Sequence, residues 1–360
     1  MRILAFGTYN TAVHPRVGIL VEGLRDAGHT VSELNEPLRV STENRVAALS
    51  SPSAALSFFG SLAANWSRLV SGSFSYRGTS KPDAIVVGYL GHFDVLLARL
   101  LFPRATIILD HLIYASDTAA DRGAKGGLLR RVLTGLDRLA LSAATIVVYD
   151  TPAHAALAPA SLRHKGVVVP VGAPDEWFDA RETNPVNGVV FYGLYTPLQG
   201  SPTIARALRI LADRGDLPPV TMIGTGQDYD EVRRLAGDAE VTWVDWVDPA
   251  DLPAVVAHHS IGLGIVGTTE KAQRVVPNKV YQSMAAGCAI ITSDTVPQRE
   301  VLGGAATYVP AGDAEALADA IRDLIGDPER RQAMRARAAE LADHAFTHQA
   351  VVAPLVERLS

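Results

Sequence analysis

The sequence lacks the patterns that would assign it to an extracellular or membrane-spanning class. A single cysteine, Cys288, excludes an internal disulfide. The most apolar stretch, 84–109, is interrupted by Asp94, Arg99 and Arg104, so we do not expect it to cross a bilayer. No charged-then-apolar leader opens the chain, and we therefore expect a cytoplasmic protein that can sit peripherally on the inner face of the membrane.

The common nucleotide and metal motifs are also missing. The loop that starts at Gly7 has one glycine where the dinucleotide fingerprint requires three, and Gly224-Thr-Gly226 lacks the third. No Walker A sequence occurs, and the ten histidines show no HExxH spacing. The adjacent His258 and His259 are more typical of a surface pair than of a metal site. These absences argue against an NAD-dependent oxidoreductase, a P-loop NTPase and a zinc protease.

Charge is distributed unevenly along the chain. Residues 1–175 contain 17 Lys/Arg against 13 Asp/Glu, whereas residues 176–360 contain 16 against 25. The stretch Arg45–Lys81 has four basic residues, no acidic one and several aromatic side chains. Further basic residues gather on one predicted helix: Arg122, Lys125, Arg130, Arg131 and Arg138. Such a face is either a solvated surface or a site for an anionic membrane or acceptor, and the acidic second half argues against nucleic acid as a partner.

Apolar, β-rich runs alternate with helical patterns over the whole chain. The expected strands of the first half are 2–6, 29–33, 83–88, 105–109, 144–149 and 166–170. Those of the second half are 188–193, 219–224, 239–244, 260–266, 288–292 and 305–309. This alternation predicts an α/β fold with two parallel, doubly wound sheets, in domains 1–172 and 173–345. Ligands of such sheets bind at the carboxyl ends of the strands, which places a cleft between the two domains.

The most informative segment is 267–287, which follows an apolar run over 261–266. Asn278 is expected to cap a helix that ends at the final glycine of the segment. The start of this helix directs N–H groups and the positive end of its dipole above the sheet, which suits a phosphate or pyrophosphate. Lys279 and Gln282 lie three residues apart on one helical face, so both can reach the same ligand. The alternative is an ordinary α/β loop whose Lys and Gln are solvated.

This segment, with its Pro-Asn-Lys-Val-Tyr-Gln opening at 277–282 and its Ala-Ala-Gly end, resembles a known enzyme family. It is similar to the retaining, nucleotide-sugar-dependent glycosyltransferases of the GT-B fold, family 4, often called glycosyltransferases group 1. The resemblance covers nearly the whole chain and implies two Rossmann-like domains facing a cleft. It implies an N-terminal domain on the acceptor side, a C-terminal donor domain, and a last helix in 346–360 that crosses back to pack on the N-terminal domain.

The resemblance also implies donor-binding residues. Gly193-Leu-Tyr-Thr-Pro-Leu-Gln-Gly resembles a family loop, Gly-Arg-x-x-x-x-Lys-Gly, whose Arg and Lys hold the donor pyrophosphate. This chain has Leu194 and Gln199 at those positions, so Lys279 and the helix start would supply the missing charge. The residues expected around the donor nucleotide and its phosphates are Gly7, Gly193, Gln199, Gly224, Gly226, Val247, Asn278, Lys279 and Gln282.

Residues for the sugar and the acceptor follow from the same resemblance. The family's two glutamates, eight residues apart, align with Arg274 and Gln282. Arg274 cannot accept hydrogen bonds from sugar hydroxyls, so Glu270 is the expected substitute beside it at the donor sugar. His111, preceded by Asp110, matches a family histidine that faces the anomeric carbon, and these two are the catalytic candidates. The acceptor candidates are Tyr9, Asn10, His14 and Asp117.

We therefore expect a retaining glycosyltransferase that moves a sugar from a uridine diphosphate sugar to an acceptor hydroxyl. The expected settings are cell-surface glycan, glycolipid or natural-product glycoside synthesis, with an anionic or membrane-linked acceptor or a soluble glycoside. In enzymes of this fold the leaving phosphate itself takes the acceptor proton, and no metal and no cofactor are expected. The alternatives are a nucleotide-sugar epimerase or a phosphorylase of the same fold, and a non-catalytic binding relative. The sugar, the linkage and the oligomeric state do not follow from the sequence.

Overall fold

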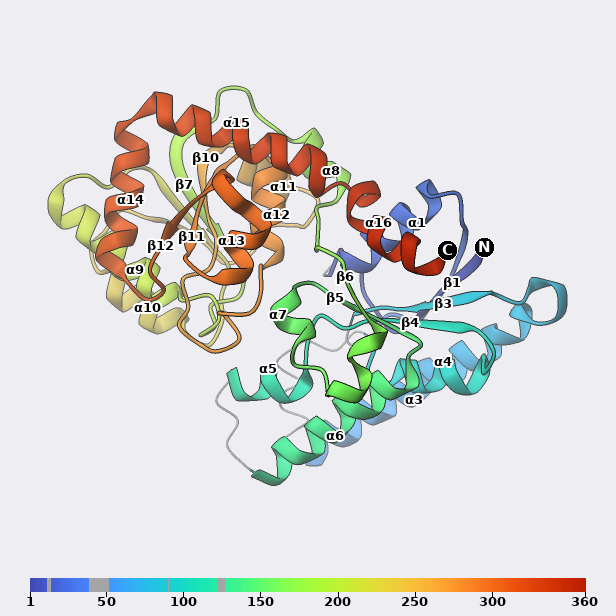
Figure 1. Cartoon of the computed structure of the whole chain (residues 1–360). Helices are drawn as coiled ribbons and strands as arrows, with labels where there is room; N and C mark the ends of the chain where they lie inside the picture. The colour runs from blue at the N-terminus through green and yellow to red at the C-terminus, as the bar shows by residue number, and fades with distance from the viewer. Residues whose placement is uncertain (12–13, 39–51, 90, 122–126) are drawn as a thin grey trace. The chain divides into compact units, whose positions relative to one another are not determined.

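The chain forms two compact units (Figure 1). The computed structural model describes residues 1–11, 14–38, 52–89, 91–121 and 127–360. The first unit comprises Met1–Val169 and Val352–Ser360, and the second comprises Pro170–Val351. No described helix is long and apolar enough to cross a membrane.

The first unit is built on a six-stranded parallel sheet in the order β2-β1-β3-β4-β5-β6. Its strands are β1 (Arg2–Gly7), β2 (Thr30–Asn35), β3 (Ala84–Val87), β4 (Thr106–Asp110), β5 (Ile146–Tyr149) and β6 (Gly166–Val168). Its helices are α1 (Arg16–Asp26), α3 (Pro52–Ser73), α4 (Asp94–Leu101), α5 (Ala115–Asp121), α6 (Gly127–Ala143), α7 (Pro152–Ala155) and α16 (His348–Leu359). The central strands β3 and β4 are buried on both faces, as their continuous apolar sequences predict.

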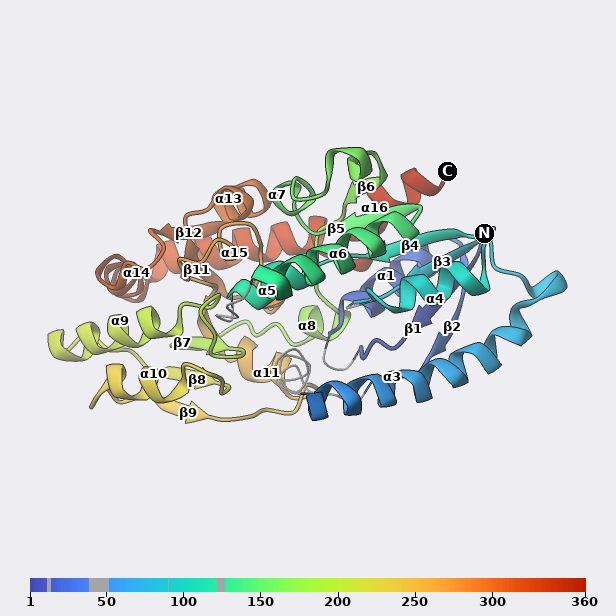
Figure 2. The same cartoon turned by 90° about the horizontal axis from the view of Figure 1, so that it is seen from below.

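Helices cover both faces of this sheet. Leu69 of α3, Val95 of α4 and Leu141 of α6 pack in one cluster with apolar strand residues, and Figures 1 and 2 show the three helices side by side. On the opposite face α1 packs through Val17 and Val21 against Ala5. The last helix, α16, lies beside α1 (Figures 1 and 2), so the expectation that it returns to the N-terminal domain is confirmed.

The second unit repeats this plan with the strand order β12-β11-β10-β7-β8-β9. Its strands are β7 (Val186–Tyr192), β8 (Val220–Ile223), β9 (Thr242–Val244), β10 (His259–Leu263), β11 (Ala289–Ser293) and β12 (Ala306–Val309). Its helices are α8 (Asp175–Asp179), α9 (Ser201–Arg214), α10 (Tyr229–Ala236), α11 (Leu252–Ala257), α12 (Asn278–Ala285), α13 (Val296–Leu302), α14 (Ala314–Gly326) and α15 (Pro328–Ala345). Each of the twelve expected strands overlaps an observed one, so the doubly wound α/β architecture is confirmed.

A glycine in β10 allows the close packing of α12 on the sheet. Ile261 and Leu263 pack in the cluster that contains α9, α10 and α14. The intervening Gly262 faces the other side, where a Cβ would lie 2.9 Å from the Ser283 side chain of α12. The glycine therefore lets α12 approach the sheet closely, and the start of this helix lies beyond the carboxyl end of the neighbouring β7.

Candidate functional site

The start of α12 differs in one respect from the expectation. Pro277 is the residue before the helix, with an extended backbone (φ −75°, ψ 154°), and no side chain caps the helix. The expectation that Asn278 is the cap is wrong: Pro277 already sets the direction of the chain, and Asn278 is the first helical residue. The end of the helix is as expected. Gly287 has φ +80°, and the Cys288 amide donates to Ser283 at 2.9 Å.

Lys279 in the first turn of α12 has an unusual environment for a charged residue. Its side chain is only 5% exposed, and its Nζ lies 3.6 Å from the centre of the Phe191 ring. Within the part of the chain that the structure describes, this Nζ has no hydrogen-bond partner. Burial lowers the pKa of the Lys279 ammonium well below its ordinary value.

Gly193 and Gln199 lie against the same lysine. Gly193 has φ +137°, and a Cβ at this position would lie 3.2 Å from Lys279 Nζ and 3.8 Å from Gln199 Nε2. Gln199 Oε1 is buried and lacks a hydrogen-bond partner among the described residues. The structure thus brings together three of the expected donor residues, at the carboxyl end of β7. Leu194, where the family has arginine, is half exposed.

Tyr192 was not expected, and it holds the first turn of α12 in place beside Gly193. Its hydroxyl donates to the Lys279 carbonyl at 3.0 Å and lies 3.5 Å from Gln282 Oε1. Its ring stacks on Trp177 at 5.6 Å between centroids. The sequence feature that could have identified Tyr192 is its position: it is a polar aromatic residue at the end of a buried strand, directly before Gly193.

The glycines of the loop after β8 allow its backbone to approach Gly193 closely. A Cβ on Gly224 would collide with the Gly193 carbonyl, and one on Gly226 would lie 2.5 Å from the Tyr195 carbonyl. Both glycines have positive φ, and the Tyr195 amide donates to Thr225 at 2.9 Å. The two loops are therefore locked together by their backbones. Contact of these glycines with a nucleotide stays a prediction.

The remaining donor candidates are more exposed. Glu270 lies at the surface and pairs with Arg274 at 3.5 Å, so part of its charge is neutralised by the other sugar candidate. Val247 follows β9 in a loop whose Trp246 side chain is 73% exposed. Trp246 is therefore not a core residue, and its ring is accessible to a planar ligand.

His111 lies at the carboxyl end of β4 in a buried group of rings in the first unit. It is 2% exposed, and its ring lies 4.5 Å from Tyr114 and 5.1 Å from His92 between centroids. Its Nε2 is buried and has no hydrogen-bond partner among the described residues. Burial, with smaller contributions from His92 and His154, lowers the pKa of His111 well below its ordinary value. The imidazole is consequently neutral at neutral pH.

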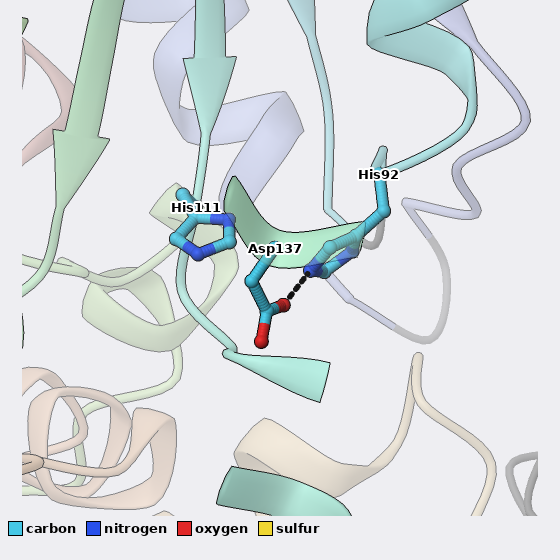
Figure 3. A group of neighbouring side chains, drawn as sticks. All are labelled: His92, His111 and Asp137. Atoms are coloured by element: carbon cyan, nitrogen blue, oxygen red, sulfur yellow. Dashed lines mark hydrogen bonds and ion pairs between the residues drawn. The ribbon is translucent and has the colours of Figure 1, made fainter. Parts of the chain in front are cut away.

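Asp137 of α6 anchors this group (Figure 3). Its carboxylate lies 3.0 Å from His92 Nε2 and accepts from the Ala115 amide at 2.8 Å and from the Ser116 amide and hydroxyl at 3.2 and 2.8 Å. The start of α5 is therefore held by a side chain from another helix. Sequence reasoning missed Asp137, although an acid on the apolar face of α6, beside Leu133 and Leu141, was a signal.

His92, His111 and Asp137 are also the described residues that could hold a metal ion, because their ligand atoms lie within 4.8 Å of one another. The donor set is chemically suitable for a transition metal. However, the Asp137 carboxylate already has the four contacts described above. The Asp137 carboxylate is satisfied without an ion, and we draw no step of the chemistry through a metal.

Asp110, the other catalytic candidate, points away from His111. Its Oδ1 forms an ion pair with Arg16 Nε at 3.2 Å, and both side chains are at most 1% exposed. Arg16 also donates to the Val169 carbonyl at 2.8 Å. Burial raises the pKa of Asp110, and Arg16 opposes this shift. Successive residues of a strand face opposite sides of a sheet, so Asp110 fixes α1 and does not share the surroundings of His111.

The loop after β1 is tied to α4 by a residue that the sequence did not single out. Gly7 has φ +144°, and a Cβ there would lie 2.9 Å from Asp94 Oδ2. That oxygen accepts from the Thr8 amide at 2.7 Å and the Thr8 hydroxyl at 2.8 Å. Trp66 Nε1 donates to the other oxygen at 2.8 Å. Gly7 is thus required by the close approach of Asp94, and a role near the donor phosphates stays a prediction.

The four acceptor candidates are not equivalent. Tyr9 is 4% exposed, and its hydroxyl donates to Glu33 at 3.2 Å, so it belongs to the core beneath α1. Asn10, His14 and Asp117 are partly exposed. His14 packs against Tyr89 at 4.1 Å between ring centroids. Contact with an acceptor stays a prediction for all four.

Comparison with known proteins agrees with this geometry. A model of the family described as "Glycosyl transferases group 1" matches residues 187–327, which hold β7, α12 and the loops around Lys279. The chain is similar to this family over these 141 of its 360 residues. A phosphatidyl-myo-inositol mannosyltransferase from Mycolicibacterium smegmatis is 31% identical over 170 residues, 42% of this chain. That match spans only 39% of the length of the mannosyltransferase.

Solved structures show the same fold over nearly the whole chain. Sucrose-phosphate synthase from Thermosynechococcus elongatus has a TM-score of 0.70 at 16% identity, covering 99% of this chain and 98% of its own. HepE from Anabaena in complex with UDP-glucose has a TM-score of 0.68 at 13% identity, with the same coverage. At these identities the likeness shows the fold alone, and that fold is GT-B.

The positively chargeable group at this loop comes from a different part of the chain than in the family loop that the sequence resembles. The family loop carries an arginine and a lysine at the positions of Leu194 and Gln199. Here the amino group that meets this loop comes from Lys279 of α12, beside Gly193. One group that can carry a positive charge therefore lies at the loop, although both of the usual residues are absent.

Proposed function

We propose that the protein is a retaining glycosyltransferase that uses a nucleoside diphosphate sugar, with uridine as the base, and transfers the sugar to an acceptor hydroxyl. The observation that carries this proposal is the buried Lys279 side-chain nitrogen, which lies beside Gly193 and Gln199 and has no hydrogen-bond partner among the described residues. A dianionic pyrophosphate is the ligand that such a group lacks. Solved proteins of the same fold bind UDP or UDP-sugars, which supports uridine.

In the proposed reaction, the bond between the anomeric carbon and the terminal phosphate oxygen breaks. A bond from the acceptor oxygen to the anomeric carbon forms on the same face of the sugar, and the acceptor proton passes to the leaving phosphate oxygen. Charge therefore accumulates on the diphosphate, where Lys279 and the first amides of α12 stabilise it. We propose that the reaction needs neither a metal nor a cofactor, because these groups supply the positive charge.

We propose that His111 contacts the transferred sugar. A neutral imidazole with a free Nε2 can donate to or accept from a sugar hydroxyl, depending on its tautomer. His92 and Asp137 act as positioning residues, because they fix the start of α5 beside this ring. Asp110 positions α1 through Arg16.

We propose further that the acceptor is linked to a membrane. The partly matching mannosyltransferase acts, by its name, on a phosphatidylinositol lipid. In the first unit, α6 exposes Leu128, Val132 and Leu139 together with Arg131 and Arg138. Apolar and basic side chains mixed on one helix suit an anionic lipid surface. Of the other basic residues expected on this helix, Arg122 and Lys125 lie outside the described residues.

The test is incubation with a panel of UDP- and GDP-sugars while release of the nucleoside diphosphate is followed, in the presence of a chelator. A transferase releases diphosphate fastest with an acceptor hydroxyl present, and the product keeps the anomeric configuration of the donor. Release into water alone favours the epimerase alternative, and release that requires inorganic phosphate favours a phosphorylase. Tight binding without release by any route would leave the protein as a non-catalytic relative. Loss of activity with the chelator would contradict the proposed independence of metal.

A further inference from the structure

Lys279 has surroundings that disfavour its charged form. The side chain lies among uncharged groups: the Phe191 ring at 3.6 Å, the Tyr192 ring at 5.9 Å, and Gln199 beside Gly193. The face of the Phe191 ring attracts an ammonium by about 2 kcal/mol in a desolvated site, which is less than the several kcal/mol that burial of an unpaired ion costs. The lysine is the second residue of α12, where the positive end of the helix dipole further disfavours a cation.

No acidic side chain of the described residues compensates for this placement. Burial is the cause of the lowered pKa of Lys279, and no charged side chain of the described residues adds a separate contribution. Tyr192, the titratable group on the neighbouring strand, is fully buried, and burial raises its pKa well above its ordinary value, so it remains a neutral phenol. A lone buried ammonium without a hydrogen-bond acceptor is strongly disfavoured against its neutral amine.

We propose that Lys279 is a neutral amine in the free protein and takes up one proton from solvent when the donor diphosphate binds. This inference rests on the proposed function, because the diphosphate is the anion that makes the charged form favourable. The balance is simple: one proton enters with each donor, the amine becomes an ammonium paired with the phosphate oxygens, and the proton returns to solvent when the diphosphate leaves. The site therefore carries its full positive charge only while a diphosphate is present.

Two consequences distinguish this lysine from an ordinary phosphate ligand. Donor affinity must fall as pH rises through the range between the pKa of the free lysine and the higher pKa of the bound one. The limit is about tenfold per pH unit, because one proton is coupled to one ligand. The site must also bind uncharged analogues more weakly, because an uncharged ligand does not stabilise the protonated form of Lys279.

Isothermal titration calorimetry tests the proposal directly. UDP-glucose is the main probe, because esterification of its terminal phosphate removes the phosphate ionisation that occurs near neutral pH in UDP. Titrations at pH 8 in buffers of different ionisation enthalpy give the number of protons taken up per ligand bound. We expect a value near one, and an affinity for UDP-glucose that weakens progressively above this pH.

Two variants assign the proton. Lys279→Met keeps an unbranched apolar chain over Phe191 and should bind more weakly with no proton uptake. Gln282→Met, on the same face of α12, should weaken binding but leave proton uptake per bound ligand unchanged. Thermal unfolding of both variants checks that the second unit is folded. Tight binding by the wild type with no proton uptake, or uptake that persists in Lys279→Met, overturns this inference and leaves the proposed function standing. Failure of the wild type to bind either UDP-glucose or UDP overturns both.

Discussion

At the scale of single residues, the protein shows how one charge can be supplied from a different part of the chain. The β7–α9 loop has lost both of its expected cations, at Leu194 and Gln199, yet the Lys279 side chain reaches the same glycine from α12. Position in space, and not position in the motif, decides whether an anion can be bound. A buried cation also makes stronger interactions than an exposed one, because water does not screen it.

Replacing Lys279 with alanine should therefore weaken UDP binding by at least about tenfold, because a charge-assisted hydrogen bond contributes roughly 1.5–3 kcal/mol. Calorimetric dissociation constants for UDP provide the measurement. Lys81→Ala, a lysine of the first unit, is the matched control and should bind UDP as the wild type does. An unchanged constant for the Lys279 variant would remove the diphosphate from the start of α12.

His111→Ala should lower turnover sharply while binding of UDP changes little, because we assign His111 to the sugar and Lys279 to the diphosphate. Steady-state kinetics and UDP titration, measured on the same preparation, separate the two effects. His164→Ala removes an exposed histidine of the same unit and should leave both unchanged. If the His111 variant turns over normally, or has merely lost its fold by circular dichroism, the residue is structural.

At the scale of secondary-structure elements, the sequence predicted the strands but not the buried polar contacts between elements. The strands were recognisable because a parallel strand covered by helices on both faces is a continuous apolar run, as in Ile107–Leu109. The contact of Asp137 with His92 joins positions 45 residues apart and depends on how α6 packs, which local pattern does not encode. The cap was misassigned at Asn278 because Pro277, a poor cap by its side chain, already has the required extended backbone.

Asp137→Ala should destabilise the first unit by about 1–3 kcal/mol or more, because it leaves the buried donors at the start of α5 without an acceptor. Thermal or urea unfolding measures the loss. Asp137→Asn keeps one carbonyl acceptor and should lose less. If the alanine variant is as stable as the wild type, α5 is not anchored through this carboxylate.

At the scale of the whole molecule, the two units carry different charge and different surfaces. The acidic residues concentrate after residue 175, in the part that contains Lys279 and the family match. The first unit is more basic, and it exposes large apolar side chains on α3 and α6, among them Leu56 and Val132. Within the stretch Arg45–Lys81, Arg45 lies outside the described residues, Arg68 pairs with Glu36 at 3.3 Å, and Arg77 lies over the Phe74 ring.

This division predicts that the protein binds anionic vesicles through its first unit. Binding should have an electrostatic component, which salt weakens, and an apolar component, which persists in high salt. Sedimentation with phosphatidylserine vesicles should weaken between 0.1 and 1 M salt, because the Debye length falls from about 10 Å to about 3 Å. Replacing Arg68 and Arg77 by serine should reduce the salt-sensitive part, whereas Leu128→Ser with Val132→Ser should reduce the part that persists in high salt. Serine at Arg330 and Arg337 of α15 makes the same change of charge in the second unit and should have no effect. Absence of vesicle binding at low salt, together with full activity on a neutral soluble acceptor, would show that the basic and apolar face of the first unit is ordinary solvated surface.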